Sequence, residues 1–240
     1  MPRVRIESGA ENTRVDVTGG DARHLVKVLR LAKGDEVVAF DGKGGEWSAT
    51  IAAASPSRVT VALGPKRRAV TESPCRILLG QGIGKGEKLD LVVRAGTELG
   101  VAEIVPVLTS RAIATADGTA KVDRWRRIAE EACKQSGRSV VPVVHAPEDL
   151  AAFLVRAKSA ALKVVPWEGG GITLGAAASA ASASSAAILI GPEGGLSEKE
   201  VVAAEKSGFV AVTLGPRILR TETAGIVAVA ALQLLAGDLR

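Results

Sequence analysis

The segment Leu214–Ala224, with the sequence LGPRILRTETA, is a polar loop between two apolar segments. The run Val210–Leu214 predicts a buried strand, and the alanine-, valine- and leucine-rich residues after the loop predict a helix. Two arginines, two threonines and a glutamate between core elements indicate a loop that holds a ligand. The alternative, in which Arg217 and Arg220 are surface charges paired with Glu222, fits this position between core elements less well.

A second loop, GPEGGL at Gly191–Leu196, follows the apolar run Ala187–Ile190. Its three glycines permit close backbone approach to a flat ligand. A capping box at Ser197–Glu200 predicts a following helix with free N–H groups at its start. Alone, the motif is also typical of a structural turn. Together the two loops predict a site made by the ends of two neighbouring strands.

The composition allows one large domain or two small ones: the chain has 240 residues, and 47% of them are hydrophobic. The net charge of +5 favours a polyanionic partner only weakly, because charge governs association rather than fold. Three tryptophans, three phenylalanines and no tyrosine are too few for a broad platform on which single-stranded bases stack.

Cysteine and histidine usage supports neither a disulfide scaffold nor a metal site. Cys75 and Cys133 lie far apart, neither belongs to a CxxC pair, and His24 and His145 are isolated. The N-terminus lacks the apolar core of a signal peptide, and no window is apolar enough to span a bilayer. We therefore expect a reduced, cytoplasmic protein with neither a metal nor a membrane partner.

The first part of the chain is predicted to be rich in β-structure, with strands at 36–40, 46–53 and 58–63. The sequence DGKGG at Asp41–Gly45 is a strong hairpin signal between the first two strands.

A helix is predicted at Asp21–Arg30, with a basic stripe of Arg23, Lys27 and Arg30 at positions i, i+4 and i+7. The stripe suits an RNA contact and a solvated helix face equally well. Residues 1–73 carry 12 basic and 9 acidic side chains, a net charge of +3, which suits a docking role.

After a predicted linker at Gly64–Arg68, strands and helices alternate, which implies a mainly parallel sheet. Strands are expected at Arg76–Leu79, Ile104–Leu108, Val140–Val144, Leu162–Val165, Ala187–Ile190 and Val210–Leu214. Helices are expected at Glu87–Leu99, Asp123–Gly137, Pro147–Ala157, Ser197–Gly208 and Ala224–Leu235. The alanine- and serine-rich stretch 175–186 is compatible with a helix or a loop.

The sequence GQGIGK at Gly80–Lys85 invites comparison with nucleotide-binding loops. It lacks the spacing of a P-loop, and Lys85 stands where GxGxxG has its third glycine. GxGxG fits a Rossmann-type methyltransferase, but the next strand ends at Thr109 without the acid that binds ribose hydroxyls. We therefore predict a flexible loop, with Lys85 and Lys88 as contacts to phosphate.

The two C-terminal loops together resemble a family signature. LIGPEGGLS with Glu200, followed by LGPRILRTETA, closely resembles the C-terminal motifs of the bacterial 16S rRNA (uracil-N3)-methyltransferases of the SPOUT superfamily. Weaker matches are HLVKVLRL at 24–31, FDG at 40–42, GEK at 86–88, ELGV at 98–101 and EEACKQSGR at 130–138. The resemblance covers nearly the whole chain, although the stretch 169–186 is less distinctive.

The resemblance implies a PUA-like β-barrel RNA-binding domain at residues 1–70. It implies a SPOUT-type α/β methyltransferase domain with a deep C-terminal trefoil knot at 71–240. Three knot loops, one of them Pro166-Trp167-Glu168, are expected to bind S-adenosylmethionine in a bent shape. The implied cofactor contacts are Pro166, Ile190, Gly191, Gly194, Gly195, Leu196, Leu214, Gly215, Ile218, Leu219 and Thr221.

The resemblance also implies partners. The expected substrate is uridine 1498 of 16S rRNA in the small ribosomal subunit. Its phosphates are expected to contact Arg3, Arg23, Lys27, Arg30, Lys85 and Arg111. The family is dimeric, so a homodimer is expected, with Gln135 and Arg138 at the interface.

Methylation at N3 implies roles for two residues of the opening segment. Uracil N3 carries a proton, so the enzyme must generate an anion and align it with the methyl donor; alignment alone supplies about 7–11 kcal/mol. Because arginine stays protonated, Arg220 is expected to bind a uracil carbonyl oxygen and stabilise the anion. Glu222 is the nearest candidate base, with Glu193 behind it; either can instead anchor Arg220, with the proton passing to water. Arg217 is expected at the surface.

Two other functions fit the same residues. One is a SPOUT methyltransferase that acts on another RNA position or on a 2′-hydroxyl. The other is a non-catalytic rRNA-binding protein of ribosome assembly that uses the β-barrel as its reader. The intact pair of C-terminal loops favours an enzyme.

Overall fold

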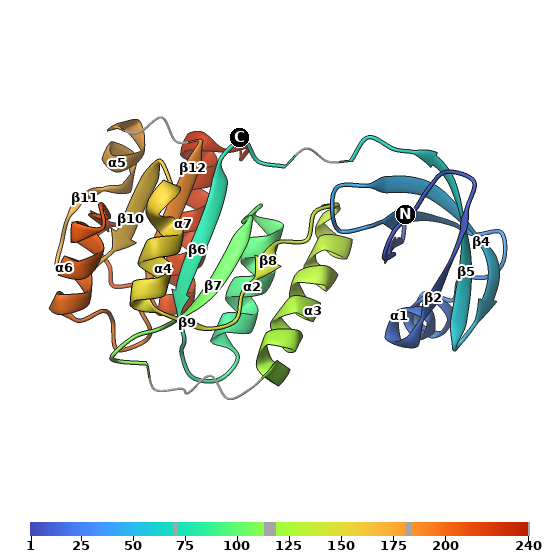
Figure 1. Ribbon diagram of the computed structural model, residues 1–240, viewed down its shortest axis with the longest axis horizontal. Coiled ribbons are helices and arrows are strands. Elements are labelled where there is room, and N and C mark those ends of the chain that lie inside the picture. Colours follow the sequence, from blue (N-terminus) through green and yellow to red (C-terminus); the bar gives the residue numbers. More distant parts are fainter. Residues whose placement is uncertain (70–71, 113–118, 181–183, 240) are drawn as a thin grey trace. The chain divides into compact units, whose positions relative to one another are not determined.

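The computed structural model describes residues 1–69, 72–112, 119–180 and 184–239 (Figure 1). The chain forms two compact units. The first comprises Met1–Glu72 together with Glu130–Val141, and the second comprises Ser73–Ala129 together with Pro142–Arg240.

The first unit is built on a five-stranded sheet in the order β1-β3-β4-β5-β2. Its strands are β1 Arg3–Arg5, β2 Arg14–Thr18, β3 Glu36–Phe40, β4 Glu46–Ser55 and β5 Arg58–Lys66. β1 pairs with β3 in parallel and the other neighbours are antiparallel. Alternate apolar side chains point inward and form one core, which includes Val4, Val37, Trp47, Ile51 and Val61.

The predicted hairpin between β3 and β4 is confirmed. Asp41 Oδ1 accepts hydrogen bonds from the backbone N–H groups of Lys43 (2.8 Å) and Gly45 (2.9 Å). The predicted linker at 64–68 is wrong in its first half. β5 continues to Lys66, which pairs with Trp47 of β4, so backbone pairing outweighs the glycine and proline signal.

The predicted helix at 21–30 is present in a different form. It consists of α1 (Gly19–Arg23) and a π-helical turn, η1 (His24–Val28). The Leu29 N–H donates to the carbonyl of His24 (3.0 Å), and the Leu31 N–H donates to that of Leu25 (2.9 Å). Arg30 closes the turn with a φ of +56°, a left-handed conformation that is uncommon outside glycine.

Residues 130–141 belong to the first unit because their side chains form hydrogen bonds and ion pairs with residues of its strands and of its first helix. Ser139 Oγ donates to Glu46 Oε2 (2.6 Å), and Lys134 Nζ lies 2.7 Å from Asp21 Oδ1. These residues include the C-terminal end of α3 (Thr119–Ser136). The helix begins before the predicted Asp123 cap.

The second unit is built on a sheet in the order β11-β13-β10-β12-β6-β7-β8, with β9 paired to β7, and every pair is parallel as predicted. Its strands are β6 Arg76–Gly82, β7 Glu103–Leu108, β8 Val143–Val144, β9 Glu148–Asp149, β10 Leu162–Pro166, β11 Ile172–Thr173, β12 Ser185–Ile190 and β13 Val210–Thr213. Its helices besides α3 are α2 Lys88–Glu98, α4 Leu150–Arg156, the 3-10 turn η2 Ala157–Ser159, α5 Leu174–Ala180, α6 Glu198–Lys206 and α7 Thr221–Ala236.

The helices cover both faces of this sheet (Figure 1). α4 and α6 pack on one face, where Phe153 and Val201 join Leu189 of β12 in a buried cluster. α7 packs on the other face: a Cβ on Gly225 would approach the side chain of Ile190, which alternates with Leu189 along β12. α2 and α5 both contact α7.

The predicted flexible loop at 80–85 is wrong in its first half, because β6 runs through Gly82. A Cβ on Gly80 would lie 2.3 Å from the Phe153 ring, and one on Gly82 would lie 2.4 Å from the Pro192 nitrogen. These glycines are therefore required for packing against α4 and against the loop after β12. They do not form a nucleotide-binding loop.

Two helices, α4 and α7, begin at other residues than predicted. α4 begins at Leu150, after Asp149 accepts a hydrogen bond from the Ala152 N–H (2.8 Å). α7 begins at Thr221, three residues before the predicted start, so the end of the opening segment is helical. The predicted capping box of α6 is confirmed. Within the stretch 175–186, α5 ends at Ala180 and β12 begins at Ser185, and residues 181–183 lie outside the described residues.

Candidate active site at the carboxyl ends of three strands

The loops that follow β10, β12 and β13 lie at the same edge of the sheet, because the three strands are parallel. The prediction that β12 and β13 are neighbours is wrong. β10 lies between them, and its loop, Pro166 to Glu168, supplies a wall between the two predicted loops.

Thr221, the first residue of α7, joins two of these loops directly. Its hydroxyl donates to the carbonyl oxygen of Gly191, at the end of β12. The Thr221 hydroxyl oxygen in turn accepts a hydrogen bond from Nε2 of Gln81 in β6 (2.8 Å). Gly225 leaves room for this glutamine, since a Cβ there would lie 2.5 Å from its Oε1. The start of α7 is thereby fixed to the end of β12.

Two adjoining hollows lie between the three loops. The larger hollow has a volume of about 330 Å³. It is lined by Lys88, Pro166, Trp167, Glu168, Ile190, Gly191, Pro192, Glu193, Gly195, Leu196, Ile218, Leu219, Arg220, Thr221 and Ala224. The two hollows share Pro166, Trp167, Glu168, Ile218, Leu219 and Ala224.

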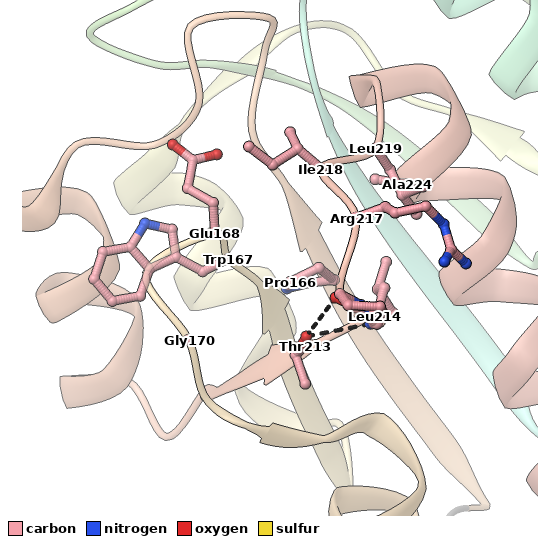
Figure 2. Close-up of a pocket in the computed structure, with 12 residues that line it drawn as sticks. Pro166, Trp167, Glu168, Gly170, Thr213, Leu214, Arg217, Ile218, Leu219 and Ala224 are labelled. Carbon is pink, nitrogen blue, oxygen red and sulfur yellow. Dashed lines mark hydrogen bonds between the residues drawn. The ribbon is translucent and has the colours of Figure 1, made fainter.

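The smaller hollow has a volume of about 180 Å³ (Figure 2). The side chains that line it alone come from the end of β13 and the loop after it, and include Thr213, Leu214 and Arg217. Thr213 Oγ1 shapes this loop, because it donates to the Gly215 carbonyl (3.1 Å) and accepts from the Gly215 N–H (3.2 Å). Figure 2 shows the Arg217 guanidinium turned away from Trp167 and Glu168, as expected for a surface residue.

The hollows have the character of a site for a partly apolar ligand. Ile218 lines both of them and is 86% exposed, so a ligand there would remove an apolar side chain from water. At Gly195 (φ +68°) and Gly215 (φ +116°) the backbone itself lines the hollows, so a ligand can approach it closely. A ligand that combines polar and apolar groups, such as S-adenosylmethionine, fits this lining.

Ten of the eleven predicted cofactor contacts line one hollow or both. Gly194 lines neither. Its carbonyl oxygen instead accepts a hydrogen bond from Arg111 Nη1 (2.9 Å), which holds the loop from outside.

Three charged side chains meet beside the larger hollow. Lys88 Nζ lies 2.9 Å from Glu193 Oε1 and 3.8 Å from Glu222 Oε2. Glu193 Oε1 also accepts a hydrogen bond from the Lys85 N–H (2.8 Å). Partial burial opposes ionisation of Glu193, but the hydrogen bonds from Lys88 and from the backbone outweigh it and lower its pKa.

Arg220 lines the larger hollow and is exposed, whereas Glu222 lines neither hollow and its side chain is 13% exposed. Arg220 is the N-cap residue of α7, and its carbonyl accepts a hydrogen bond from Ala224 (2.8 Å). Within the described residues no ion pair involves Arg220. The carboxylates predicted as its anchors are paired with Lys88 instead.

The predicted phosphate contacts have different surroundings. Arg23, Lys27, Arg30 and Lys85 are exposed. The prediction for Arg3 needs correction, because its side chain is 11% exposed and its guanidinium pairs with Glu46 (3.0 Å). It also donates to the Arg138 carbonyl (3.1 Å) and to Ser139 Oγ (3.0 Å).

Of the two predicted interface residues, Gln135 is exposed. The prediction for Arg138 needs correction. Arg138 is 5% exposed and pairs with Glu72 within the first unit, so its guanidinium is not at the surface.

Trp167, in the loop expected to complete the pocket, lines both hollows, whereas Lys88 and Ala224 were not predicted as residues of the hollows. Lys88 follows β6, and β6 neighbours β12, so its place at the same sheet edge follows from the strand order. That order was not available from one sequence.

No cluster of metal-ligating side chains occurs in the part of the chain that the structure describes, and no helix there is long and apolar enough to cross a membrane. Cys75 and Cys133 are free and buried, and burial raises the pKa of Cys75 and raises that of Cys133 to about 11.

Comparison with known proteins identifies the family. Residues 71–233 match the model of an RNA methyltransferase domain, and residues 17–63 match that of an RNA methyltransferase PUA domain. Ribosomal RNA small subunit methyltransferase E of Bacillus subtilis is 34% identical over 235 residues, 92% of each chain. The chain belongs to the ribosomal RNA small subunit methyltransferase E family.

Two solved structures support the same family. Ribosomal RNA small subunit methyltransferase E of Neisseria gonorrhoeae, bound to S-adenosyl methionine, is 35% identical and superposes with a TM-score of 0.92 over the whole of both chains. A methyltransferase of Legionella pneumophila with bound SAM is 32% identical, with a TM-score of 0.91 over 99% of this chain and 98% of that one. The predicted fold class, enzyme class and cofactor of this family member are confirmed.

Ala224 offers a direct test of where the cofactor binds, because it lines both hollows from the first turn of α7. Replacing Ala224 with leucine adds volume without straining the helix. We expect the affinity for S-adenosylmethionine, measured by calorimetry, to fall at least about tenfold, a loss of about 1.4 kcal/mol. Ala151→Leu, at an exposed position of α4, is the matched control. Unchanged affinity in Ala224→Leu would place the cofactor elsewhere.

Proposed function

We propose that this enzyme uses S-adenosylmethionine to methylate N3 of uridine 1498 in 16S rRNA of the small ribosomal subunit. The observation that carries the proposal is the larger hollow, where three loops of a methyltransferase domain surround an exposed arginine without an ion pair among the described residues. The names of the relatives support the small-subunit rRNA as the substrate class. The alternatives are another RNA position and a non-catalytic role in ribosome assembly.

Backbone and apolar groups of the three loops would hold the cofactor: Ile190, Gly191 and Leu196 in the larger hollow, Leu214 and Gly215 in the smaller one, and Ile218 in both. When bound, the cofactor supplies an electrophilic methyl group, which moves from its sulfur to uracil N3 as N3 loses its proton. The chain must therefore hold the uracil edge beside the hollow and stabilise the negative charge that develops on it.

Arg220 suits this charge stabilisation. Its guanidinium cannot serve as a base, but it can donate two hydrogen bonds to a carbonyl oxygen that gains negative charge. The carboxylates suit the role of base less well. Glu222 lines neither hollow, and the lowered pKa of Glu193 makes it a weak proton acceptor. We propose that the proton passes to water and that Glu222 supports the electrostatic surroundings of Arg220.

Arg220→Ala tests the assignment. We expect S-adenosylmethionine to bind with nearly unchanged affinity in calorimetry, because the cofactor walls remain. Tritium transfer from labelled cofactor to 16S rRNA should fall by about 10²–10³, the usual loss when a donor to a developing anion is removed. Arg94→Ala, which removes an exposed arginine of α2 that lines neither hollow, is the control.

The result that would contradict this role is wild-type turnover in Arg220→Ala. Mapping methylated nucleosides in 16S rRNA from a deletion strain separates the proposed target from the alternatives. Loss of a methyl group at another position would move the substrate. Loss of none, together with no transfer by the wild-type protein, would favour the assembly role.

We propose further that residues 1–70 form an RNA-binding domain and residues 71–240 the methyltransferase domain. The exposed side chains of Arg23, Lys27 and Arg30 support this, since they follow one another on α1, η1 and the turn after them. Arg111 and Lys85 would contribute phosphate contacts from the second unit. Localisation in the cytoplasm is part of the same proposal.

Replacing Arg23, Lys27 and Arg30 together with glutamine should weaken binding to 16S rRNA and flatten its salt dependence. Each lost phosphate contact should reduce the slope of log K against log salt concentration by about 0.7–0.9. Filter binding at several salt concentrations measures this. Glutamine at Lys158, Lys199 and Lys206 removes the same charge elsewhere, and an equal effect there would show that only net charge matters.

A homodimer is proposed as the working form, with Gln135 near the interface. We expect α7 to contribute to the dimer interface as well. Three of its apolar residues, Val227, Leu234 and Leu235, are exposed, and no charged side chain occurs between Thr223 and Gly237. Val227 is seven and eight positions from Leu234 and Leu235, so the three side chains lie on one side of the helix. Exposed apolar side chains grouped in this way mark a site of association.

Leu234→Glu should convert the dimer to a monomer, with half the mass in light scattering, because a buried carboxylate without a partner is costly. Val155→Glu replaces an equally exposed apolar residue on α4 and should leave the mass unchanged. A wild-type protein that is monomeric throughout the concentration series would refute the proposal.

A further inference from the structure

Lys88 links three segments that are far apart in the sequence. It is the first residue of α2, while Glu193 lies in the loop after β12 and Glu222 in the first turn of α7. Its Nζ lies 2.9 Å from Glu193 Oε1 and 3.8 Å from Glu222 Oε2. One ammonium group therefore faces two carboxylates beside the larger hollow.

Glu222 depends on this contact more than Glu193 does. Its Oε2 is buried and accepts no hydrogen bond from the residues that the structure describes. A buried charge without a partner is costly, so the Lys88 ammonium is the compensating charge for Glu222. Glu193 has additional support, because it accepts the Lys85 N–H at 2.8 Å.

Arg220 is the other cation on the wall of the larger hollow. It lies two residues before Glu222, and in the described part of the chain it forms no ion pair. Without Lys88, Glu193 and Glu222 would be two carboxylates without their shared cation. An arginine readily forms bidentate pairs with carboxylates, so Arg220 would be drawn to them.

We propose that Lys88 is a positioning residue: it holds Glu193 and Glu222, and thereby keeps Arg220 available for the substrate. The inference rests on the proposed role of Arg220 at the uracil. The lowered pKa of Glu193 agrees with a carboxylate held in its charged form by this lysine and by the backbone.

Lys88→Met removes the charge while keeping much of the side-chain volume. We expect kcat for methyl transfer to 16S rRNA to fall about 10²-fold, the scale of losing one donor to a developing anion. The Kd for S-adenosylmethionine, measured by calorimetry without RNA, should change far less. Lys88→Arg should keep most of the activity. Lys206→Met, at the end of α6, controls for the loss of one lysine.

The decisive variant is Lys88→Met combined with Glu193→Gln and Glu222→Gln. It lacks the lysine and also both carboxylates that would capture Arg220, so kcat should recover at least about tenfold over Lys88→Met. A triple variant as slow as Lys88→Met would overturn the proposal, because it would mean that the lysine acts on the substrate itself. Wild-type kcat in Lys88→Met would overturn it as well.

A measurement without substrate separates this proposal from the proposed function. The Nε–H signal of Arg220 in a nitrogen-15 NMR spectrum, assigned by its loss in Arg220→Ala, should shift in Lys88→Met and return toward its wild-type position in the triple variant. An unmoved signal in folded Lys88→Met would refute the role of Lys88. If the wild-type protein transferred no methyl group to 16S rRNA, the proposed function would fail, while this spectrum would still test the ion pairs.

Discussion

The geometry of the candidate site depends on the hydroxyl group of Thr221. It donates to the Gly191 carbonyl and accepts from Gln81, so one buried oxygen joins β6, the end of β12 and the start of α7. A hydroxyl has the one donor and the acceptor capacity that this arrangement requires. Arg220 and Glu222 flank Thr221 in the sequence, so fixing this residue also fixes where both charged side chains leave the backbone.

Local signals in the sequence were enough to predict much of the architecture. The Asp41–Gly45 hairpin, the Ser197 capping box and the strand ends that carry the two C-terminal loops each depend on neighbouring residues. Strand order is a long-range property, and for this reason the place of β10 between β12 and β13 was missed. Gly80 was misread for a similar reason, since the ring that requires it, Phe153, is distant in the sequence.

The charged residues show a second limit of sequence reasoning. All four arginines, Arg3, Arg23, Arg138 and Arg220, look alike in the sequence. In the structure the side chains of Arg3 and Arg138 are largely buried in the first unit, where they form ion pairs with Glu46 and Glu72. The sequence shows which residues are charged, but burial and ion pairing in the folded protein decide which of these charges remain available to a ligand. The carboxylates near Arg220 illustrate the same point, because a lysine from another segment holds them.

The first unit is discontinuous, because it combines residues 1–72 with residues 130–141. A chain is synthesised from its N-terminus, and domains fold as units when their residues have emerged. Glu46 and Arg3 obtain Ser139 as a partner only after residues 73–129 of the second unit have been made. During synthesis, the strands of the first unit therefore lack the Ser139 hydrogen bonds of Arg3 and Glu46 until the ribosome has extended the chain through residues 130–141.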